Sequence, residues 1–135
     1  LFPIRGQVIS VEKPPGLTSD IIYADADHET TTYIIPRSRD CLLGGTYQYY
    51  NGETEVDEQI AQEILARCAM FNPALRNVTI FQHKVGLRPG RATVRLETEQ
   101  LHSGQYVIHN YGHGSIGHTL SWGCAAEVVQ RIQSL

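Results

Sequence analysis

One segment near the end of the chain constrains its fold more than any other. A strand-like run, Tyr106-Val107-Ile108, leads into residues 109–119, which hold three glycines, and apolar residues then recur at helical spacing from Ile116 to Ile132. A glycine-rich turn between a strand and a helix directs backbone N–H groups and the positive end of the helix dipole to one point. Such a point binds an anion or an electron-rich heteroatom, although glycines also make simple tight turns.

Composition and charge narrow the class of protein. The 135 residues are 41% hydrophobic and 19% charged, which indicates one globular domain at most. The formal net charge of −3 argues against nucleic acid or an anionic membrane as a partner. No apolar run approaches the ~20 residues of a membrane-spanning helix. The spacing of Cys41, Cys68 and Cys124 fits no zinc or redox motif, so we expect three buried thiols.

The pattern along the chain predicts strands, one helix, more strands and a final helix. The expected strands are residues 5–12, 31–36, 41–47, 78–87, 92–97 and 105–108. Thr54 is the expected cap of a helix whose apolar positions extend from Val56 to Phe71. Segment 17–32 is polar and weakly patterned, so we expect a surface loop. Its alternating acidic residues do not form a calcium site, because the glycine and the closing glutamate of such a site are absent. The order predicts an α+β fold on a largely antiparallel sheet, with one crossover helix and a C-terminal helix.

Six short blocks, together with the glycine-rich segment, resemble the D-amino-acid oxidase family of FAD-dependent enzymes. They are Pro3-Ile4-Arg5-Gly6-Gln7, Tyr33-Ile34-Ile35-Pro36, Gly44-Gly45-Thr46-Tyr47, Gly86-Leu87-Arg88-Pro89-Gly90, Val94-Arg95-Leu96-Glu97 and Ser121-Trp122-Gly123. In that family a sheet of this kind roofs the flavin ring, and the final helix returns to the flavin-binding domain. The resemblance implies a substrate-side sheet domain over residues 1–110, followed by a flavin-contacting loop and C-terminal helix over residues 111–135.

The family also has an N-terminal portion whose Gly-x-Gly-x-x-Gly turn binds the ADP half of FAD, and no such fingerprint occurs here. We therefore expect the C-terminal part of a larger oxidase, and a complete small domain with a trimmed start is the alternative. The expected partners are a small D-amino acid and the N-terminal FAD-binding portion, and a homodimer is left open. The expected location is cytoplasmic or peroxisomal, although the final Gln133-Ser134-Leu135 differs from the Ser-Lys-Leu peroxisomal signal.

Three residues are expected to hold the substrate. A guanidinium presents a planar pair of donors that matches a carboxylate, and the resemblance implies that Arg88 binds the substrate carboxylate. It implies that the hydroxyls of Tyr33 and Tyr47 also bond the ligand, although cross-strand packing is the ordinary role of such a pair. Relatives specialised for acidic substrates tend to have arginine at the position of Tyr47, so tyrosine indicates neutral D-amino acids. Glu29 occupies the position of a lid tyrosine found in some members, and Tyr23 replaces it only loosely.

The resemblance assigns the flavin to the glycine-rich segment. The residues expected to hold its pyrimidine edge are Gly114, Ser115, Ile116, Gly117, His118 and Thr119, and Ser115 is also expected to contact the substrate. The helix start would stabilise negative charge on the reduced flavin. A zinc site at His109, His113 and His118 is less consistent with the sequence, because no nearby carboxylate or cysteine completes the ligand set. No Ser-His-Asp order or paired carboxylates indicate a hydrolase.

The activity that the resemblance implies is oxidative deamination of neutral D-amino acids to 2-oxo acids, ammonia and hydrogen peroxide, with FAD as cofactor. Two alternatives stay open. One is a related oxidase acting on glycine, N-methyl amino acids or D-aspartate, which a substrate panel distinguishes. The other is a non-catalytic fragment that binds a small carboxylate, which would lack the visible absorbance of a flavin.

Overall fold

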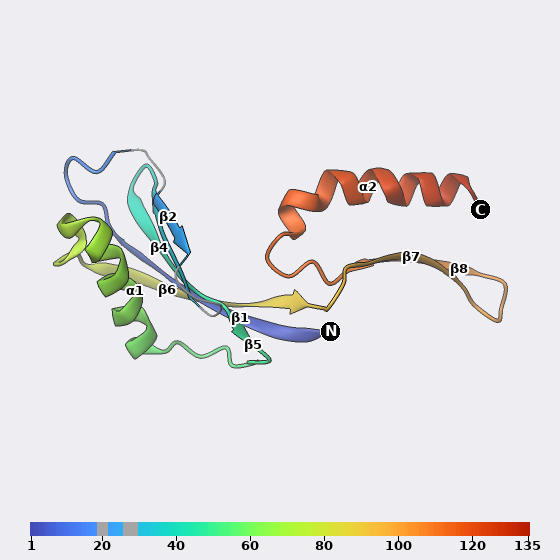
Figure 1. Cartoon of the computed structure of the whole chain (residues 1–135), viewed down its shortest axis with the longest axis horizontal. Coiled ribbons are helices and arrows are strands. Elements are labelled where there is room, and N and C mark those ends of the chain that lie inside the picture. Colours follow the sequence, from blue (N-terminus) through green and yellow to red (C-terminus); the bar gives the residue numbers. More distant parts are fainter. Residues whose placement is uncertain (19–21, 26–29) are drawn as a thin grey trace. The chain divides into compact units, whose positions relative to one another are not determined.

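The computed structural model describes residues 1–18, 22–25 and 30–135. The elements follow one another as β1 (Phe2–Glu12), β2 (Ile22–Asp25), β3 (Thr30–Pro36), β4 (Asp40–Thr46), β5 (Gln48–Tyr49), α1 (Glu58–Phe71), the 3-10 turn η1 (Pro73–Leu75), β6 (Ile80–Gly90), β7 (Arg95–Gln100), β8 (Tyr106–Tyr111) and α2 (Gly117–Gln133) (Figure 1). They form two compact units, which we call the sheet unit (residues 4–87) and the C-terminal unit (residues 1–3 and 88–135). The boundary between the units lies within β6.

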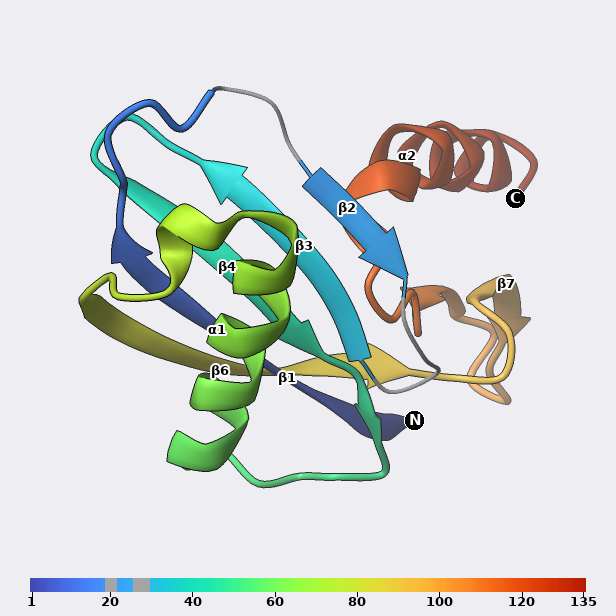
Figure 2. The ribbon, with the colours of Figure 1, turned by 60° about the vertical axis from the view of Figure 1, so that its left-hand side comes forward.

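The strands of the sheet unit are ordered β2-β3-β4-β1-β5, and β6 also pairs with β1. Figure 2 shows β2, β3, β4 and β1 side by side. The predicted hairpin is confirmed as β3 and β4, which are antiparallel with Pro36 opposite Cys41. In the turn between them the N–H of Arg37 donates to the carbonyl of Asp40 at 2.8 Å. The Arg37 side chain also pairs with the Asp40 carboxylate, which lowers the pKa of Asp40.

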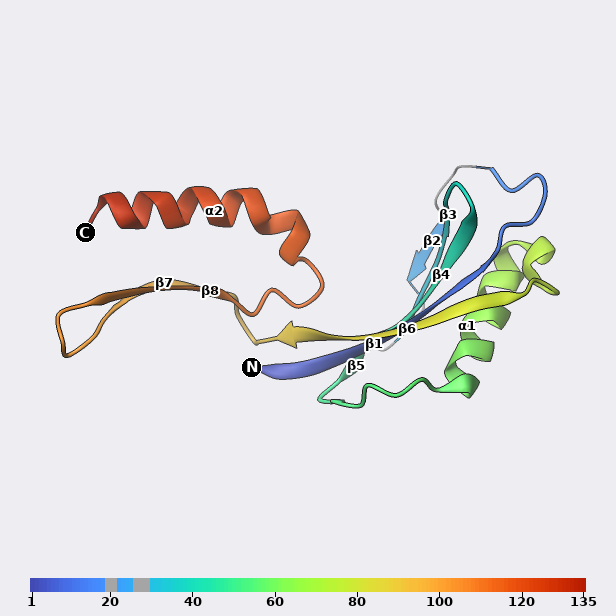
Figure 3. The ribbon, with the colours of Figure 1, turned by 180° about the vertical axis from the view of Figure 1, so that it is seen from behind.

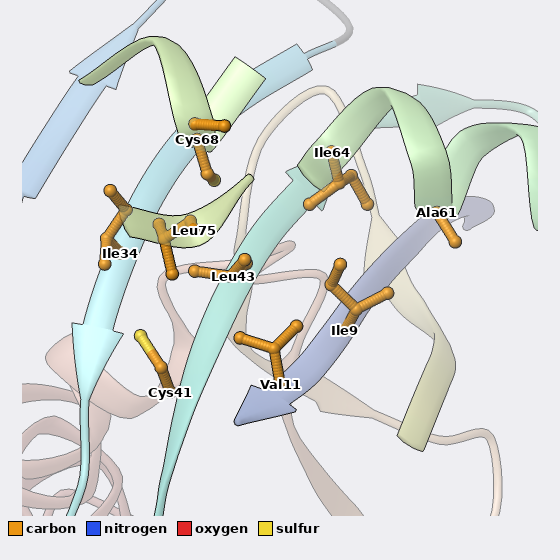
Figure 4. Close-up of a cluster of buried hydrophobic side chains, with 10 residues drawn as sticks. Ile9, Val11, Ile34, Cys41, Leu43, Ala61, Ile64, Cys68 and Leu75 are labelled. Carbon is orange, nitrogen blue, oxygen red and sulfur yellow. The ribbon is translucent and has the colours of Figure 1, made fainter. Parts of the chain in front are cut away.

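Helix α1 covers one face of this sheet, and the core lies between them (Figure 4). Successive side chains of a strand point to opposite faces, so alternate residues of each strand reach the helix. The fully buried members are Ile9, Val11, Ile34, Cys41, Leu43, Ala61, Ile64, Cys68 and Leu75. Burial of each large aliphatic side chain contributes about 1.5–3 kcal/mol to stability. The expectation that all three cysteines are buried thiols is confirmed.

The start of α1 differs from the sequence-based expectation. The helix begins at Glu58 with Asp57 as its N-cap, whereas the sequence suggested Thr54. The Asp57 carboxylate accepts hydrogen bonds from the backbone N–H groups of Gln59 at 2.9 Å and Ile60 at 3.1 Å. Asp is at least as good a cap as Thr, and its position three residues further on sets the helix start.

The segment expected to be a surface loop contains a strand. Residues Ile22–Asp25 form β2, which pairs antiparallel with β3 so that Ile22 lies opposite Ile34. Backbone pairing to the edge of β3 is sufficient for a four-residue strand, even where the sequence has no alternating pattern. Residues 19–21 and 26–29, which include Asp27 and Glu29 of the expected loop, lie outside the described residues.

In the C-terminal unit, β7 and β8 form an antiparallel hairpin in which Arg95 lies opposite Tyr111. Helix α2 follows and lies alongside this hairpin (Figure 3). Within α2 only Cys124 is buried, whereas Trp122 is 87% exposed and Ile132 is 55% exposed. No helix in the described parts of the chain has the length and apolar character needed to cross a membrane.

The predicted α+β fold class is confirmed by these antiparallel strand pairs and two helices. The predicted strands at 78–87, 92–97 and 105–108 correspond to β6, β7 and β8, with ends displaced by up to a few residues. The division into residues 1–110 and 111–135 stays a prediction.

Candidate functional site

The ring of Tyr33 lies directly over the glycine pair of the next strand. Tyr33 is opposite Gly44 in the β3–β4 register. A Cβ atom placed on Gly44 would lie 1.9 Å from the Cζ atom of Tyr33, and one on Gly45 would lie 3.2 Å from its hydroxyl oxygen. The first distance is far inside van der Waals contact, so only glycine at position 44 admits the ring. The Gly-Gly-Thr-Tyr block therefore fixes where the Tyr33 hydroxyl lies.

Tyr33 lies on the sheet face opposite α1, and Tyr47 lies in the link between β4 and β5. The neighbour of Tyr33, Ile34, packs in the core under α1, so the alternation of side chains places Tyr33 on the other face. Tyr47 directly precedes Gln48, which bonds to Arg5. The Tyr47 ring packs edge-on against Tyr49, with ring centroids 5.2 Å apart. Both candidate tyrosines are half-buried.

Arg88 lies near the end of β6, in the C-terminal unit, and is half-buried. The carbonyl of the next residue, Pro89, accepts a hydrogen bond from the N–H of Gly114 at 2.9 Å. At the same point Gly112 has a φ of +86°, and a Cβ on it would lie 2.8 Å from the Cβ of Arg91. The end of β6 and the glycine-rich loop are thus in direct contact, and that contact requires glycine.

The glycine-rich loop ends at an uncapped helix. Gly112 and Gly114 both have positive φ, and Ile116, the N-cap of α2, makes no side-chain cap hydrogen bond. The first N–H groups of a helix have no carbonyl partner within it, and the helix dipole is positive at this end. His118 and Thr119, in the first turn of α2, are exposed. The loop can therefore hold an anion or the electron-rich edge of a ring.

Two of the three histidines considered for a zinc site, His109 and His113, make side-chain contacts within the C-terminal unit. His113 Nε2 lies 3.4 Å from Cys124 Sγ, which joins the glycine-rich loop to the middle of α2. His109 Nε2 lies 2.9 Å from Glu99 Oε2 on the neighbouring strand. Cys124 was not foreseen beside His113, because the two lie in different elements. Over residues 1–18, 22–25 and 30–135, no three His, Cys, Asp or Glu side chains gather where a metal would need them.

One face of the β7–β8 hairpin carries a network of charges. The Arg95 guanidinium pairs with Glu97 and Glu99 and donates to the Tyr111 hydroxyl at 2.8 Å. The hydrogen bond from Arg95 lowers the pKa of Glu97, and hydrogen bonds from His109 and then Arg95 lower that of Glu99.

Two buried polar side chains on β1 were not predicted from the sequence. Arg5 is 2% exposed and Gln7 is fully buried, and both contact the segment that leads into α1. Their alternation with the apolar Ile9 and Val11 was the available signal, since it places all four side chains on one face. The expected lid position, Glu29, lies outside the described residues.

Two solved glycine oxidases have the fold of this chain. A glycine oxidase from Geobacillus kaustophilus has the same fold, with a TM-score of 0.78 and 22% identity over 98% of this chain and 35% of that one. A glycine oxidase from Bacillus cereus matches 88% of this chain with a TM-score of 0.69 and 25% identity. The chain therefore has the fold of the matched part of these two glycine oxidases.

The family follows from sequence. Residues 1–131 match the model of the FAD dependent oxidoreductase family, and the chain belongs to that family. A D-amino-acid oxidase of Rubrobacter xylanophilus is 49% identical over 94% of this chain and 38% of its own length. A D-amino-acid oxidase of Streptomyces coelicolor is 44% identical over 95% of this chain and 40% of its own length. The human D-aspartate oxidase is 39% identical over 98% of this chain and 38% of its own length. The chain thus spans about two fifths of the length of these curated relatives.

Proposed function

We propose that this chain is the substrate-side part of an FAD-dependent oxidase that deaminates neutral D-amino acids. The observation that carries the proposal is the hydrogen bond from Gly114 to Pro89, which joins the strand end bearing Arg88 to the glycine-rich loop. A carboxylate-binding guanidinium beside a loop that holds an electron-rich ring is what oxidation of an amino acid requires. The D-amino-acid oxidases at 49% and 44% identity support the same activity.

In this proposal the substrate is held by its α-carboxylate. Arg88 supplies two parallel N–H donors, and the hydroxyls of Tyr33 and Tyr47 supply further hydrogen bonds. In this proposal both hydroxyls act on the same ligand. Holding the carboxylate at fixed points orients the substrate Cα–H bond, which is the contribution the protein makes to the rate.

The residues of the glycine-rich loop fit FAD. Backbone N–H groups of the segment from Gly114 to Thr119 would bond the pyrimidine edge, and Ser115 would also face the substrate. FAD held there would supply the oxidant for the two-electron oxidation of the substrate Cα–H bond, with O₂ as the final acceptor that leaves as hydrogen peroxide. The positive end of α2 would stabilise negative charge beside the loop. The oxidised substrate then hydrolyses to a 2-oxo acid and ammonia.

The exposed apolar surface of α2 fits a larger protein. Trp122, Val129 and Ile132 are each more than half exposed in this chain. The chain spans about two fifths of its curated relatives, and we propose that the remaining, FAD-binding portion covers this surface. A cytoplasmic or peroxisomal location and a homodimer stay predictions.

A substrate panel tests the proposal. The whole protein, loaded with FAD, is assayed for hydrogen peroxide and 2-oxo acid with D-alanine, D-aspartate, glycine, N-methylglycine and L-alanine. We expect kcat/KM for D-alanine to exceed that for D-aspartate and glycine by about tenfold or more, because Tyr47 offers no cation to a second carboxylate. A preference for D-aspartate or glycine, or a flavin-loaded protein that makes no peroxide, would contradict the proposal.

A further inference from the structure

A buried cation lies at the end of the sheet unit where β1 meets β5. Arg5 and Gln7 occupy alternate positions on the α1 side of β1, and they are 2% and 0% exposed. The next positions on that face, Ile9 and Val11, belong to the apolar core. Burial of a guanidinium is costly unless its donors are bonded, so its partners indicate what it is there to hold.

Arg5 bonds to a segment more than forty residues away in sequence. Its Nη1 donates to Gln48 Oε1 at 2.9 Å, and its Nε and Nη2 donate to the backbone carbonyls of Glu53 at 3.1 Å and Glu55 at 2.7 Å. Nη2 also donates to Gln7 Oε1 at 2.7 Å. Among the described residues, none of these acceptors is a carboxylate. Arg5 therefore fixes the backbone conformation of this segment through directional hydrogen bonds and is not there to neutralise a carboxylate.

Gln7 extends the same network. Its Oε1 accepts from the N–H of Asp57 at 3.0 Å, and its Nε2 donates to the Asp57 carbonyl at 2.6 Å. Its own backbone N–H donates to the hydroxyl of Thr46 at 2.9 Å. Gln7 therefore fixes both the end of β4 and the residue that caps α1.

These bonds fall on either side of Tyr47. Thr46 is bonded to Gln7, and Gln48 is bonded to Arg5 and pairs with it in the β1–β5 register. β5 has only two residues, so its backbone pairing alone holds this segment weakly. The place of Tyr47 is thus set by hydrogen bonds from β1 to the residues on either side of it, one from the Gln7 backbone and one from the Arg5 side chain.

We propose that Arg5, whose guanidinium Gln7 helps to hold, is a positioning residue that acts through Gln48 on Tyr47, and that it thereby sets the substrate affinity and side-chain preference of the enzyme. The inference rests on the proposed function of Tyr47. It differs from a purely structural role in one respect. A structural role changes stability, whereas positioning of Tyr47 changes KM and the preference among substrates at nearly constant stability.

The sharpest variant is Gln48→Ala in the whole, FAD-loaded protein. It removes the bond from Arg5 Nη1 and leaves the other three Arg5 bonds in place. Gln48 is half-buried and lines a cavity of about 470 Å³, into which water can enter to replace the lost acceptor. We expect KM for D-alanine to rise about tenfold, kcat to change about twofold or less, and the ratio of kcat/KM for D-methionine over D-alanine to shift.

Two matched variants serve as controls. Gln59→Ala removes a glutamine that lines the same cavity and whose side-chain amide donates to the exposed Glu63 at 3.1 Å, and we expect wild-type constants. Gln48→Glu keeps an acceptor for Arg5 and should restore the wild-type KM. In a Tyr47→Phe background, Gln48→Ala should have little further effect on KM, because both changes act on the same hydroxyl.

Three results would overturn the inference. They are a Gln48→Ala variant with the KM of Gln59→Ala, a Gln48→Ala effect that is undiminished in the Tyr47→Phe background, and a crystal structure of Gln48→Ala with the Tyr47 ring in its original place. The last test does not depend on turnover. A wild-type protein that oxidises no D-amino acid would overturn the proposed function instead, so the two failures are distinguishable.

Discussion

At the scale of single residues, the contact between Tyr33 and Gly44 determines where the Tyr33 ring lies on the sheet, and we assign that ring to the substrate. Gly44→Ala places a methyl group 1.9 Å from the Tyr33 ring and must displace it. We expect a loss of about 1–3 kcal/mol in the free energy of unfolding, together with a large fall in kcat/KM for D-alanine. Denaturant unfolding and steady-state kinetics measure the two effects.

Gly123→Ala is the matched control for this substitution. Nothing lies within 4 Å of a Cβ at position 123, which is inside α2. Alanine there should raise stability by up to about 1 kcal/mol, because glycine is the weaker helix former. A Gly44→Ala variant with unchanged stability and activity would show that Tyr33 is not held over the glycine pair.

The side chain at position 47 is predicted to govern the choice between neutral and acidic substrates. Tyr47→Arg adds a cation that can pair with a second carboxylate and is left unpaired beside an apolar side chain. The ratio of kcat/KM for D-alanine over D-aspartate should fall by about tenfold or more. If this ratio is unchanged, Tyr47 does not face the substrate, and the assignment then depends on Tyr33 and Arg88.

At the scale of elements, the glycine-rich loop before α2 makes a prediction of its own. Gly112→Ala meets both the cost of a positive φ and a contact of 2.8 Å with the Arg91 Cβ, so the loop must move away from β6. Stability should fall by about 1–2 kcal/mol or more. The dissociation constant for FAD, measured by flavin fluorescence, should rise about tenfold or more because the loop no longer holds its donors in place.

Gly104→Ala is the control for Gly112→Ala, because it has the cost of a positive φ without a close contact that would move the glycine-rich loop. Gly104 has a similar φ of +82° in the β7–β8 turn, with nothing within 4 Å of its Cβ position. Its substitution should cost about 1–2 kcal/mol of stability and leave FAD affinity unchanged. Equal effects of the two variants on FAD affinity would remove the loop from the cofactor site.

The core between the sheet and α1 makes stability depend on alkaline pH. Burial raises the pKa of Cys41 and of Cys68 from 9.0 to about 11. Between these values the unfolded chain releases thiol protons that the folded chain retains, so stability is full below about pH 9 and falls as pH rises toward about 11. Denaturant unfolding in reductant at about pH 8, 9 and 10 measures this slope. The Cys41→Ala/Cys68→Ala variant should show a shallower slope, and equal slopes would contradict the prediction.

The elements that sequence predicted well are those with a strong local pattern. The β3–β4 hairpin and both helices follow from alternation, helical spacing and turn residues, which act within a few positions. β2 has no such pattern, and it forms because its backbone pairs with β3. The cap of α1 was misplaced because Thr54 and Asp57 are both good caps, and the bonds from Gln7 to Asp57 favour the second.

At the scale of the whole molecule, the residues proposed to bind substrate and cofactor belong to two compact units of the chain. Tyr33 and Tyr47 belong to the sheet unit, whereas Arg88 and the glycine-rich loop belong to the C-terminal unit. Sequence resemblance identified these residues, but spacing could not reveal that Gly114 bonds to Pro89 or that Arg5 bonds to Gln48. Such pairs are far apart in the chain, and their contact depends on the complete fold.

The most direct test of the central claim is the kinetic effect of replacing Arg88. In the whole, FAD-loaded protein, kcat/KM for D-alanine is compared among wild type, Arg88→Ala and Arg88→Lys. We predict a loss of about a hundredfold or more in Arg88→Ala, because the substrate carboxylate loses a charge-assisted pair of hydrogen bonds. Arg88→Lys should recover little, since an ammonium cannot form the paired bonds. Turnover within about tenfold of wild type in either variant would contradict the account.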